Sequence, residues 1–212
     1  MRILASLLAA LSLGACAQAP TPLAAASNGL EARASSRQFG WRKVGEPGVL
    51  ITPEGVESAA RARAAEWAED AELRFVAWGL VKVERLSAVN HSFFSPSRRS
   101  VLVVATFLSD QNQRAVEYSQ PDLVKPMDVL KPLGKTLIDA NRAVLLAQPY
   151  FIPGNNNPLR MVTLTHPSKF IHALWSVAGG GNLVHVNAET GTVLGIMPVE
   201  TKYPAAWRDQ RR

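Results

Sequence analysis

The chain has 212 residues, of which 47% are hydrophobic and 19% are charged, and its formal net charge is +6. These values exclude a disordered polymer, a collagen-like repeat and a long coiled coil, and they allow one moderate domain or two small ones. No wholly apolar run reaches the roughly 18 residues that a membrane-spanning helix needs, which excludes a polytopic membrane protein. The single cysteine, Cys16, excludes an intrachain disulfide and a cysteine-rich metal site.

The first residues have the order of a secretory signal, with a positive start at Arg2 and a mostly apolar stretch from Ile3 to Leu13. The sequence then reads Leu13, Gly14, Ala15, Cys16. This resembles the bacterial lipobox, in which an aliphatic residue and two small residues precede an invariant cysteine. The resemblance implies a diacylglycerol on the Cys16 sulfur, further acylation with a chain such as palmitate, and removal of residues 1–15 as a lipoprotein signal peptide. The alternative is an ordinary cleaved signal or short anchor in which Cys16 is incidental.

The same resemblance predicts a location. Each buried methylene contributes about 0.8 kcal/mol, so two or three acyl chains hold a protein on a membrane almost permanently. Ala17 stands where lipoproteins retained in the inner membrane usually carry aspartate, so the resemblance implies the outer membrane, facing the periplasm. Residues 16–45 are predicted to be the acylated cysteine and a flexible tether, because the segment after Cys16 has almost no large apolar side chain.

Residues 46–120 are predicted to form a first helix-on-sheet module. Thr52 suits a helix N-cap, Pro53 the first helical position, and Glu54 the positive end of the helix dipole. An alanine-rich apolar stripe continues the predicted helix to Ala71. Strands are expected over residues 73–83, 101–108 and 115–118.

Residues 121–203 are predicted to form a second module, after a connection marked by three prolines and before a basic tail over 204–212. A helix is expected over 136–148, and strands over 160–165, 169–177, 183–187 and 192–196. Gly179, Gly180 and Gly181 give the strongest hairpin signal in the chain. The predicted fold class is therefore α+β, with two helix-on-antiparallel-sheet modules after a signal peptide and tether.

The last predicted hairpin, Val186–Leu194, contains Ala188, Thr190 and Gly191. This segment resembles the end of PepSY-type domains, although Asn187 replaces their usual aspartate. The resemblance implies a helix packed on an antiparallel sheet, in an extracytoplasmic module that binds or restrains partners without chemistry. The alternative is that Thr190 and Gly191 only close a β-turn.

Chemical motifs are few. The histidines His91, His166, His172 and His185 form no HExxH pattern, and no GxSxG or SxxK serine motif occurs. If Gly180 and Gly181 form a two-residue turn, His172 and His185 share a sheet face but lie about 13 Å apart, too far to bind one metal. The sequence therefore predicts no catalytic residue, metal site or cofactor, and the chain is not expected to be an enzyme.

One candidate partner surface is predicted, because alternation along the strand over 73–83 puts Trp78 on one face with Arg74 and Lys82. The alternative is a tryptophan covered by the tether or the other module. We expect a non-catalytic binding, inhibitory or scaffolding role, with the membrane and an envelope protein as partners and no nucleic acid; the oligomeric state stays open. The rival is an envelope hydrolase, which a pocket gathering two or more of the histidines and aspartates would favour.

Overall fold

The computed structural model describes residues 36–44, 52–82, 85–134, 138–154 and 161–199. Its helices are α3 (Pro53–Trp67), α4 (Pro121–Asp128) and α5 (Ala140–Ala147), and a short 3-10 turn, η1 (Gln148–Tyr150), follows α5. The strands are β1 (Ser36–Lys43), β2 (Glu72–Lys82), β3 (Arg85–Ser95), β4 (Ser100–Phe107), β5 (Asn112–Tyr118), β6 (Met161–Thr165), β7 (Leu174–Gly179), β8 (Asn182–Asn187) and β9 (Val193–Pro198).

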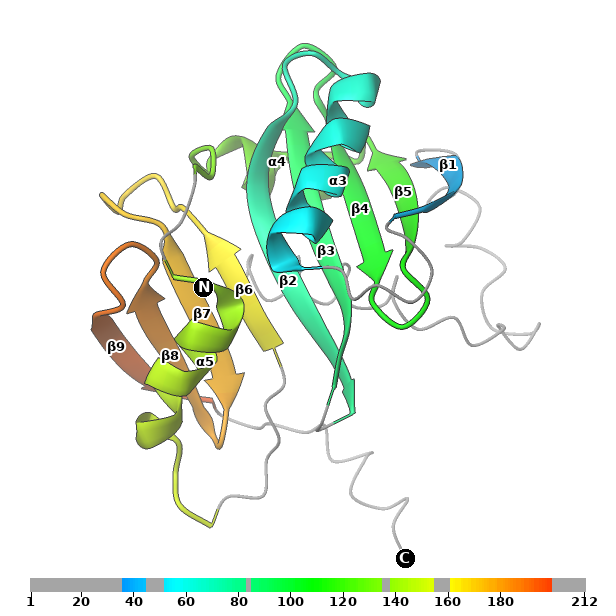
Figure 1. Ribbon diagram of the computed structural model, residues 1–212. Helices are drawn as coiled ribbons and strands as arrows, with labels where there is room; N and C mark the ends of the chain where they lie inside the picture. Colours follow the sequence, from blue (N-terminus) through cyan, green and yellow to red (C-terminus); the bar gives the residue numbers. More distant parts are fainter. Residues whose placement is uncertain (1–35, 45–51, 83–84, 135–137, 155–160, 200–212) are drawn as a thin grey trace, which may run out of the picture.

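All nine strands belong to one antiparallel sheet, in the order β1-β5-β4-β3-β2-β6-β7-β8-β9 (Figure 1). The predicted α+β fold of two helix-on-antiparallel-sheet modules is therefore wrong, because the described chain is mostly one nine-stranded sheet with three short helices. The physical reason is the pairing of β2 with β6, in which Phe75–Gly79 lie antiparallel to Met161–Thr165. The predicted boundary between the two segments, 46–120 and 121–203, stays a prediction.

β2 has the side chains of a central strand. Phe75, Val76, Ala77 and Trp78 are all buried, although successive residues of a strand point to opposite faces. A strand that is apolar on both faces gains most free energy when elements cover both faces, as they do here. The largest hydrophobic cluster crosses the seam between β2 and β6 without a break.

α3 and α5 cover the same face of the sheet, which we call the front face, with α3 over β3 and β4 and α5 over β7 and β8 (Figure 1). α3 begins as predicted, because Thr52 Oγ1 accepts a hydrogen bond from Gly55 N at 3.1 Å and Pro53 occupies the first turn. It ends at Trp67, before the predicted Ala71. α4 lies on the opposite, back face, where Met127 packs with Phe75.

Three elements were not expected from the sequence: β1, which falls within the range predicted as tether, β3 and α4. The hairpin at the glycines is confirmed as a two-residue turn. Gly179 pairs with Asn182, and Gly180 and Gly181 have φ angles of 51° and 81°. Both angles lie in the left-handed region that glycine adopts without steric cost.

Candidate functional site: a hollow over the central strands

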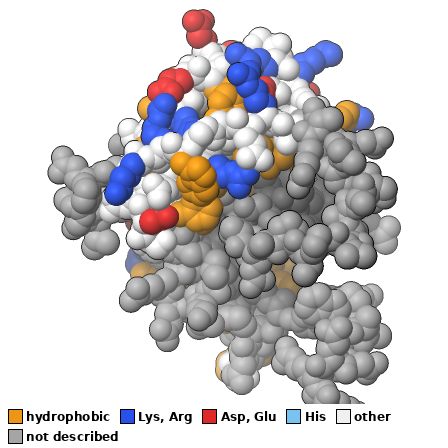
Figure 2. All heavy atoms as spheres, turned by 90° about the vertical axis from the view of Figure 1, so that its right-hand side faces the viewer, with side chains coloured by type: hydrophobic (Ala, Val, Ile, Leu, Met, Phe, Trp, Pro, Cys, Tyr) orange, Lys and Arg blue, Asp and Glu red, His pale blue; other side chains and the backbone are white. Residues whose placement is uncertain are grey.

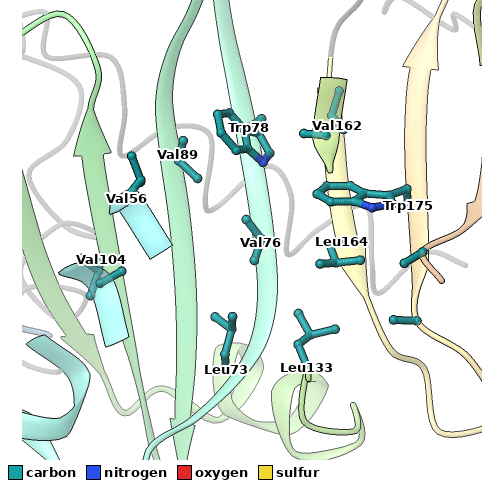
Figure 3. Packing of buried hydrophobic residues seen from close by; sticks show 14 of the residues in the cluster. Val56, Leu73, Val76, Trp78, Val89, Val104, Leu133, Val162, Leu164 and Trp175 are labelled. Atoms are coloured by element: carbon teal, nitrogen blue, oxygen red, sulfur yellow. The ribbon is translucent and has the colours of Figure 1, made fainter. Parts of the chain in front are cut away.

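A hollow of about 790 Å³ lies on the front face, lined by α3, by the start of α5 and by strands on both sides of the β2–β6 seam. Its floor consists of side chains from four strands: Val76 and Trp78 of β2, His91 of β3, Leu164 of β6 and Trp175 of β7. Figure 3 shows the two indoles and the aliphatic side chains around them over this part of the sheet. The hollow is therefore built by both halves of the chain.

Strand register explains why His91 stands out on this floor. Val104, His91, Val76, Leu164, Trp175 and Val186 lie opposite one another in one row across six strands. Every member of the row except His91 belongs to the main hydrophobic cluster. An imidazole thus sits in a row that is otherwise apolar or aromatic.

His91 is neutral in this environment. Burial is the main cause that lowers its pKa from 6.5 to about 3, and the nearby positive charge of Arg61 lowers it further. The residue is 2% exposed, and its Nδ1 atom has no hydrogen-bond partner. A buried polar atom without a partner costs about 1–3 kcal/mol, so it indicates either strain or a group that completes the site.

Trp78 presents a second atom of this kind. Its indole is 8% exposed, and its Nε1 donor is buried without an acceptor. Trp175 differs, because its Nε1 donates to the carbonyl oxygen of Ile138 at 2.7 Å. The hollow therefore has one indole whose hydrogen bond is complete and one indole whose donor is unused.

The walls of the hollow carry charge. Glu54, Glu57 and Asp139 supply carboxylates, and Arg61 supplies a guanidinium. Arg61 Nε lies 2.8 Å from Glu57 Oε1, and its NH2 group donates to the Leu133 carbonyl at 3.3 Å. Asp139 Oδ1 accepts from the Arg142 backbone N–H at 2.7 Å and caps α5. With three carboxylates and one cation, these walls are net acidic.

The predicted partner surface does not form a single face. A register shift in β2 between Leu73 and Phe75 changes the alternation, so Trp78 belongs to the front cluster while Arg74 lies over the Phe94 ring of the back cluster. Arg74 also donates to the Leu130 carbonyl and to Glu72. Trp78 and Arg74 are each only 8% exposed. The side chain of Lys82 lies outside the described residues.

The remaining histidines lie apart from the hollow. His166 bonds to backbone carbonyls, and His172 Nδ1 lies 2.8 Å from Glu189 Oε2. His185 Nδ1 lies 2.9 Å from Ser176 Oγ across β7 and β8. Burial lowers the pKa of His185. In the described ranges, no three His, Cys, Asp or Glu side chains come together in a group that could hold a metal ion.

The sequence predicted neither the serine–histidine pair nor the hollow, because both depend on how strands pair with one another. Ser176 and His185 are nine positions apart and meet only because the glycine turn fixes their register. The hollow needs the pairing of β2 with β6 and the unexpected strand β3. The two-residue glycine turn could have indicated the contact between Ser176 and His185, whereas no local sequence signal indicated the hollow.

The predicted lipid attachment remains untested. The lipid attachment residue, Cys16, lies outside the described residues. Within the described part of the chain, no helix is both long and apolar enough to span a membrane.

The β1 side of the molecule has a different character (Figure 2). Lys and Arg side chains, with a few Asp and Glu side chains among them, lie around a few exposed hydrophobic side chains there. Trp41 on β1 is 62% exposed, and its ring centroid lies 5.6 Å from that of Phe107. A smaller hollow of about 330 Å³ lies beneath β1, where Arg63 donates to the carbonyls of Gln113 and Gly40. These contacts give the buried guanidinium a structural role.

No protein-family model matches the sequence, and no curated protein matches it. Among solved structures, the chain is similar to a Clostridium difficile 630 protein provisionally described as a lipoprotein. That match has 10% identity and a TM-score of 0.48, and covers 74% of this chain and all of the other. A likeness of this degree says nothing about the function of this chain.

Proposed function

We propose that this chain is a lipid-anchored envelope protein whose folded body binds a small molecule or a segment of a partner in the front hollow, without catalysing a reaction. One observation carries the binding proposal: His91 Nδ1 and Trp78 Nε1 are buried, lack hydrogen-bond partners and belong to residues that line the same hollow. A ligand with a hydrogen-bond acceptor would accept from Trp78 Nε1 and pack against the indole and aliphatic side chains of the floor.

The anchoring proposal rests on Leu13, Gly14, Ala15 and Cys16, and on the signal-like segment before them. The outer membrane and a periplasmic orientation belong to the same proposal, because Ala17 follows the cysteine. Its test is the intact mass of protein isolated from its native membrane. A mass that fits a chain beginning at an acylated Cys16 supports the anchor, and a bare thiol or a retained leader overturns it.

The state of the groups in the hollow supports binding over catalysis. A general base works best when its pKa lies near the operating pH, and His91, with a pKa of about 3, is far from that range. Asp139 is engaged in capping α5, and Arg61 is engaged with Glu57. The charged side chains therefore stabilise the walls of the hollow.

Binding can be tested with two dyes of different charge, Nile red, which is neutral, and 1-anilinonaphthalene-8-sulfonate, which is anionic. We expect Nile red to bind more tightly, because Glu54, Glu57 and Asp139 disfavour an anion. Trp78→Phe retains an aromatic ring but removes the N–H donor, and should weaken Nile red binding about threefold to tenfold. Trp41→Phe is the matched control, because Trp41 is exposed on β1. Equal affinities of these two variants, or no dye binding at all, would contradict the proposal.

An envelope hydrolase is the second candidate function, and two observations favour it. His91 and Asp139 line the same hollow, which is the gathering of histidine and aspartate expected for a hydrolase, and Ser176 is hydrogen-bonded to His185 on the back face. A fluorophosphonate probe, which reacts with activated serines, separates the two functions. Labelling that is lost in Ser176→Ala and retained in Ser97→Ala, at an exposed serine of the turn between β3 and β4, would establish the hydrolase and overturn the non-catalytic proposal.

A further inference from the structure

The connection between β6 and β7, residues 166–173, presents apolar side chains to solvent. Ile171 is 83% exposed and Phe170 is 39% exposed. Val129 lies beside this loop, because Leu130 forms a β-bridge with Pro167, and it is 62% exposed. These three side chains, which we call the apolar tip, contribute little to the hydrophobic core.

The loop is nevertheless held firmly. Lys131 Nζ donates to the Phe170 carbonyl at 2.9 Å, and the Lys131 N–H donates to the His166 carbonyl at 2.8 Å. His166 Nε2 lies 3.3 Å from the Phe170 oxygen and 3.1 Å from the Ile171 oxygen. These hydrogen bonds hold the loop in a conformation that leaves the Ile171 side chain in solvent. This conformation does not add the Ile171 side chain to the hydrophobic core.

Cations border the apolar tip. Lys131 contacts the loop as described, and Lys169 Nζ lies 5.4 Å from the centre of the Phe170 ring. The nearby acidic groups are Asp128, next to Val129 in the chain, Glu189, which is paired with His172, and Glu72, which is paired with the same Arg74 side chain that donates to the Leu130 carbonyl. Lysine stems can lie along an apolar surface while their ammonium groups reach phosphate, so this combination suits the interface of an anionic bilayer.

Strand register places the apolar tip at the end of the sheet where the described chain begins. Ser36 pairs with Tyr118, Tyr118 with Val101, and Val101 with Phe94, so these residues lie at one end of their strands. Phe94 pairs with Glu72, the first residue of β2, and β6 ends at Thr165 close to the start of β2. The chain that follows Cys16 therefore enters the sheet at the end that carries residues 166–173.

We propose that this end of the sheet rests on the membrane surface, with Ile171, Phe170 and Val129 inserted at the level of the headgroups and Lys131 and Lys169 facing lipid phosphates. The proposal rests on the proposed lipid anchor for its biological setting. The contact itself is a property of the folded surface. It would orient the hollow and the rest of the body relative to the bilayer.

The test uses the chain from residue 16 with Cys16→Ser, which carries no acyl group, mixed with sedimenting vesicles of phosphatidylglycerol and phosphatidylethanolamine. We expect measurable binding that Ile171→Ser weakens on the order of tenfold, the effect of removing one inserted aliphatic side chain. Ile152→Ser is the matched control, because Ile152 is 49% exposed and bonds to Gly180 at the opposite end of the sheet. It should leave binding unchanged.

Two further measurements identify the source of binding. Lys169→Gln, which leaves the Lys131 hydrogen bond to the loop in place, should weaken binding to anionic vesicles and leave weak binding to vesicles of phosphatidylcholine unchanged. Equal binding by the Ile171→Ser and Ile152→Ser variants, or no binding by the unacylated chain, would overturn the proposal. Because this chain lacks the anchor, either result is distinguishable from a failure of acylation at Cys16, which the intact mass reports.

Discussion

Val76 on β2 and Leu164 on β6 lie opposite each other on the front face, at the junction where two halves of the chain become one sheet. Both side chains are buried and belong to the same hydrophobic cluster. Because one core spans this junction, the two halves should not behave as independent folding units.

The first prediction follows from this pair. Leu164→Ala removes buried methyl groups at the seam and should lower the free energy of unfolding by about 2–5 kcal/mol. Urea unfolding followed by far-ultraviolet circular dichroism and by tryptophan fluorescence should give one coincident transition in both proteins. Leu194→Ala, at a side chain that is 52% exposed on β9, is the control and should change stability little. Two separated transitions would contradict a single cooperative sheet.

The second prediction concerns His91 and pH. The pKa of His91 is about 3 in the folded protein and 6.5 in the unfolded chain. At pH values between these two, the unfolded chain therefore binds more protons than the folded protein. The stability that His91 contributes is therefore complete above about pH 6.5 and is lost as the pH falls towards 3. The loss at pH 5 should be on the order of 2 kcal/mol.

His91→Phe should remove this part of the acid sensitivity, because phenylalanine does not titrate. The measurement is the free energy of urea unfolding at pH 7, 6 and 5. Leu194→Ala, at an exposed side chain without a titratable group, is the control and should keep the wild-type slope. If the His91→Phe slope equals that of the wild type, His91 is not the buried neutral group described here.

A third prediction tests the start of α5. Asp139→Ala removes the acceptor for the Arg142 N–H and should destabilise the protein by about 0.5–2 kcal/mol. Asp139→Asn keeps a side-chain oxygen in the same place and should recover most of the loss. Thermal unfolding of the two variants measures the difference. Equal losses would show that the charge of Asp139 matters more than its hydrogen bond.

A fourth prediction compares two glycines with positive φ. A Cβ on Gly180, at φ +51°, would lie 2.3 Å from Phe151 Cβ, whereas a Cβ on Gly154, at φ +75°, would meet no atom within 4 Å. Gly154→Ala should cost about 1 kcal/mol from backbone strain alone. Gly180→Ala should cost clearly more in denaturant unfolding, because the turn or Phe151 must also move. Similar losses would mean that Phe151 moves aside freely.

The sequence predicted local structure where a residue type has one strong preference. Thr52 and Pro53 begin α3 as expected, and the glycine pair closes the β7–β8 hairpin as expected. β3 was missed because Asn90, His91 and Ser92 are polar and consecutive, and such a run usually indicates a loop. In the fold all three are buried within the sheet, where tertiary context overrides local polarity.

Side-chain direction was harder to predict than element position. Within the helix predicted over 136–148, α5 buries the small residues Ala140, Ala143 and Ala147, while the larger Leu145 is 55% exposed. Small alanines allow the helix to approach the sheet closely. Likewise, strict alternation along β2 placed Arg74 beside Trp78, and the register shift separated them. The floor of the hollow depends on such long-range pairings, which no local pattern contains.

The pairing of β2 with β6 also has a consequence during biogenesis. As the polypeptide emerges from a ribosome or a translocation channel, β2 can pair with β3 early, but its other edge waits for residues 161–165. Until then, a strand whose residues 75–78 are apolar or aromatic presents unsatisfied backbone groups, a typical template for aggregation. Shielding of that edge until the second half arrives would therefore reduce aggregation of the nascent chain.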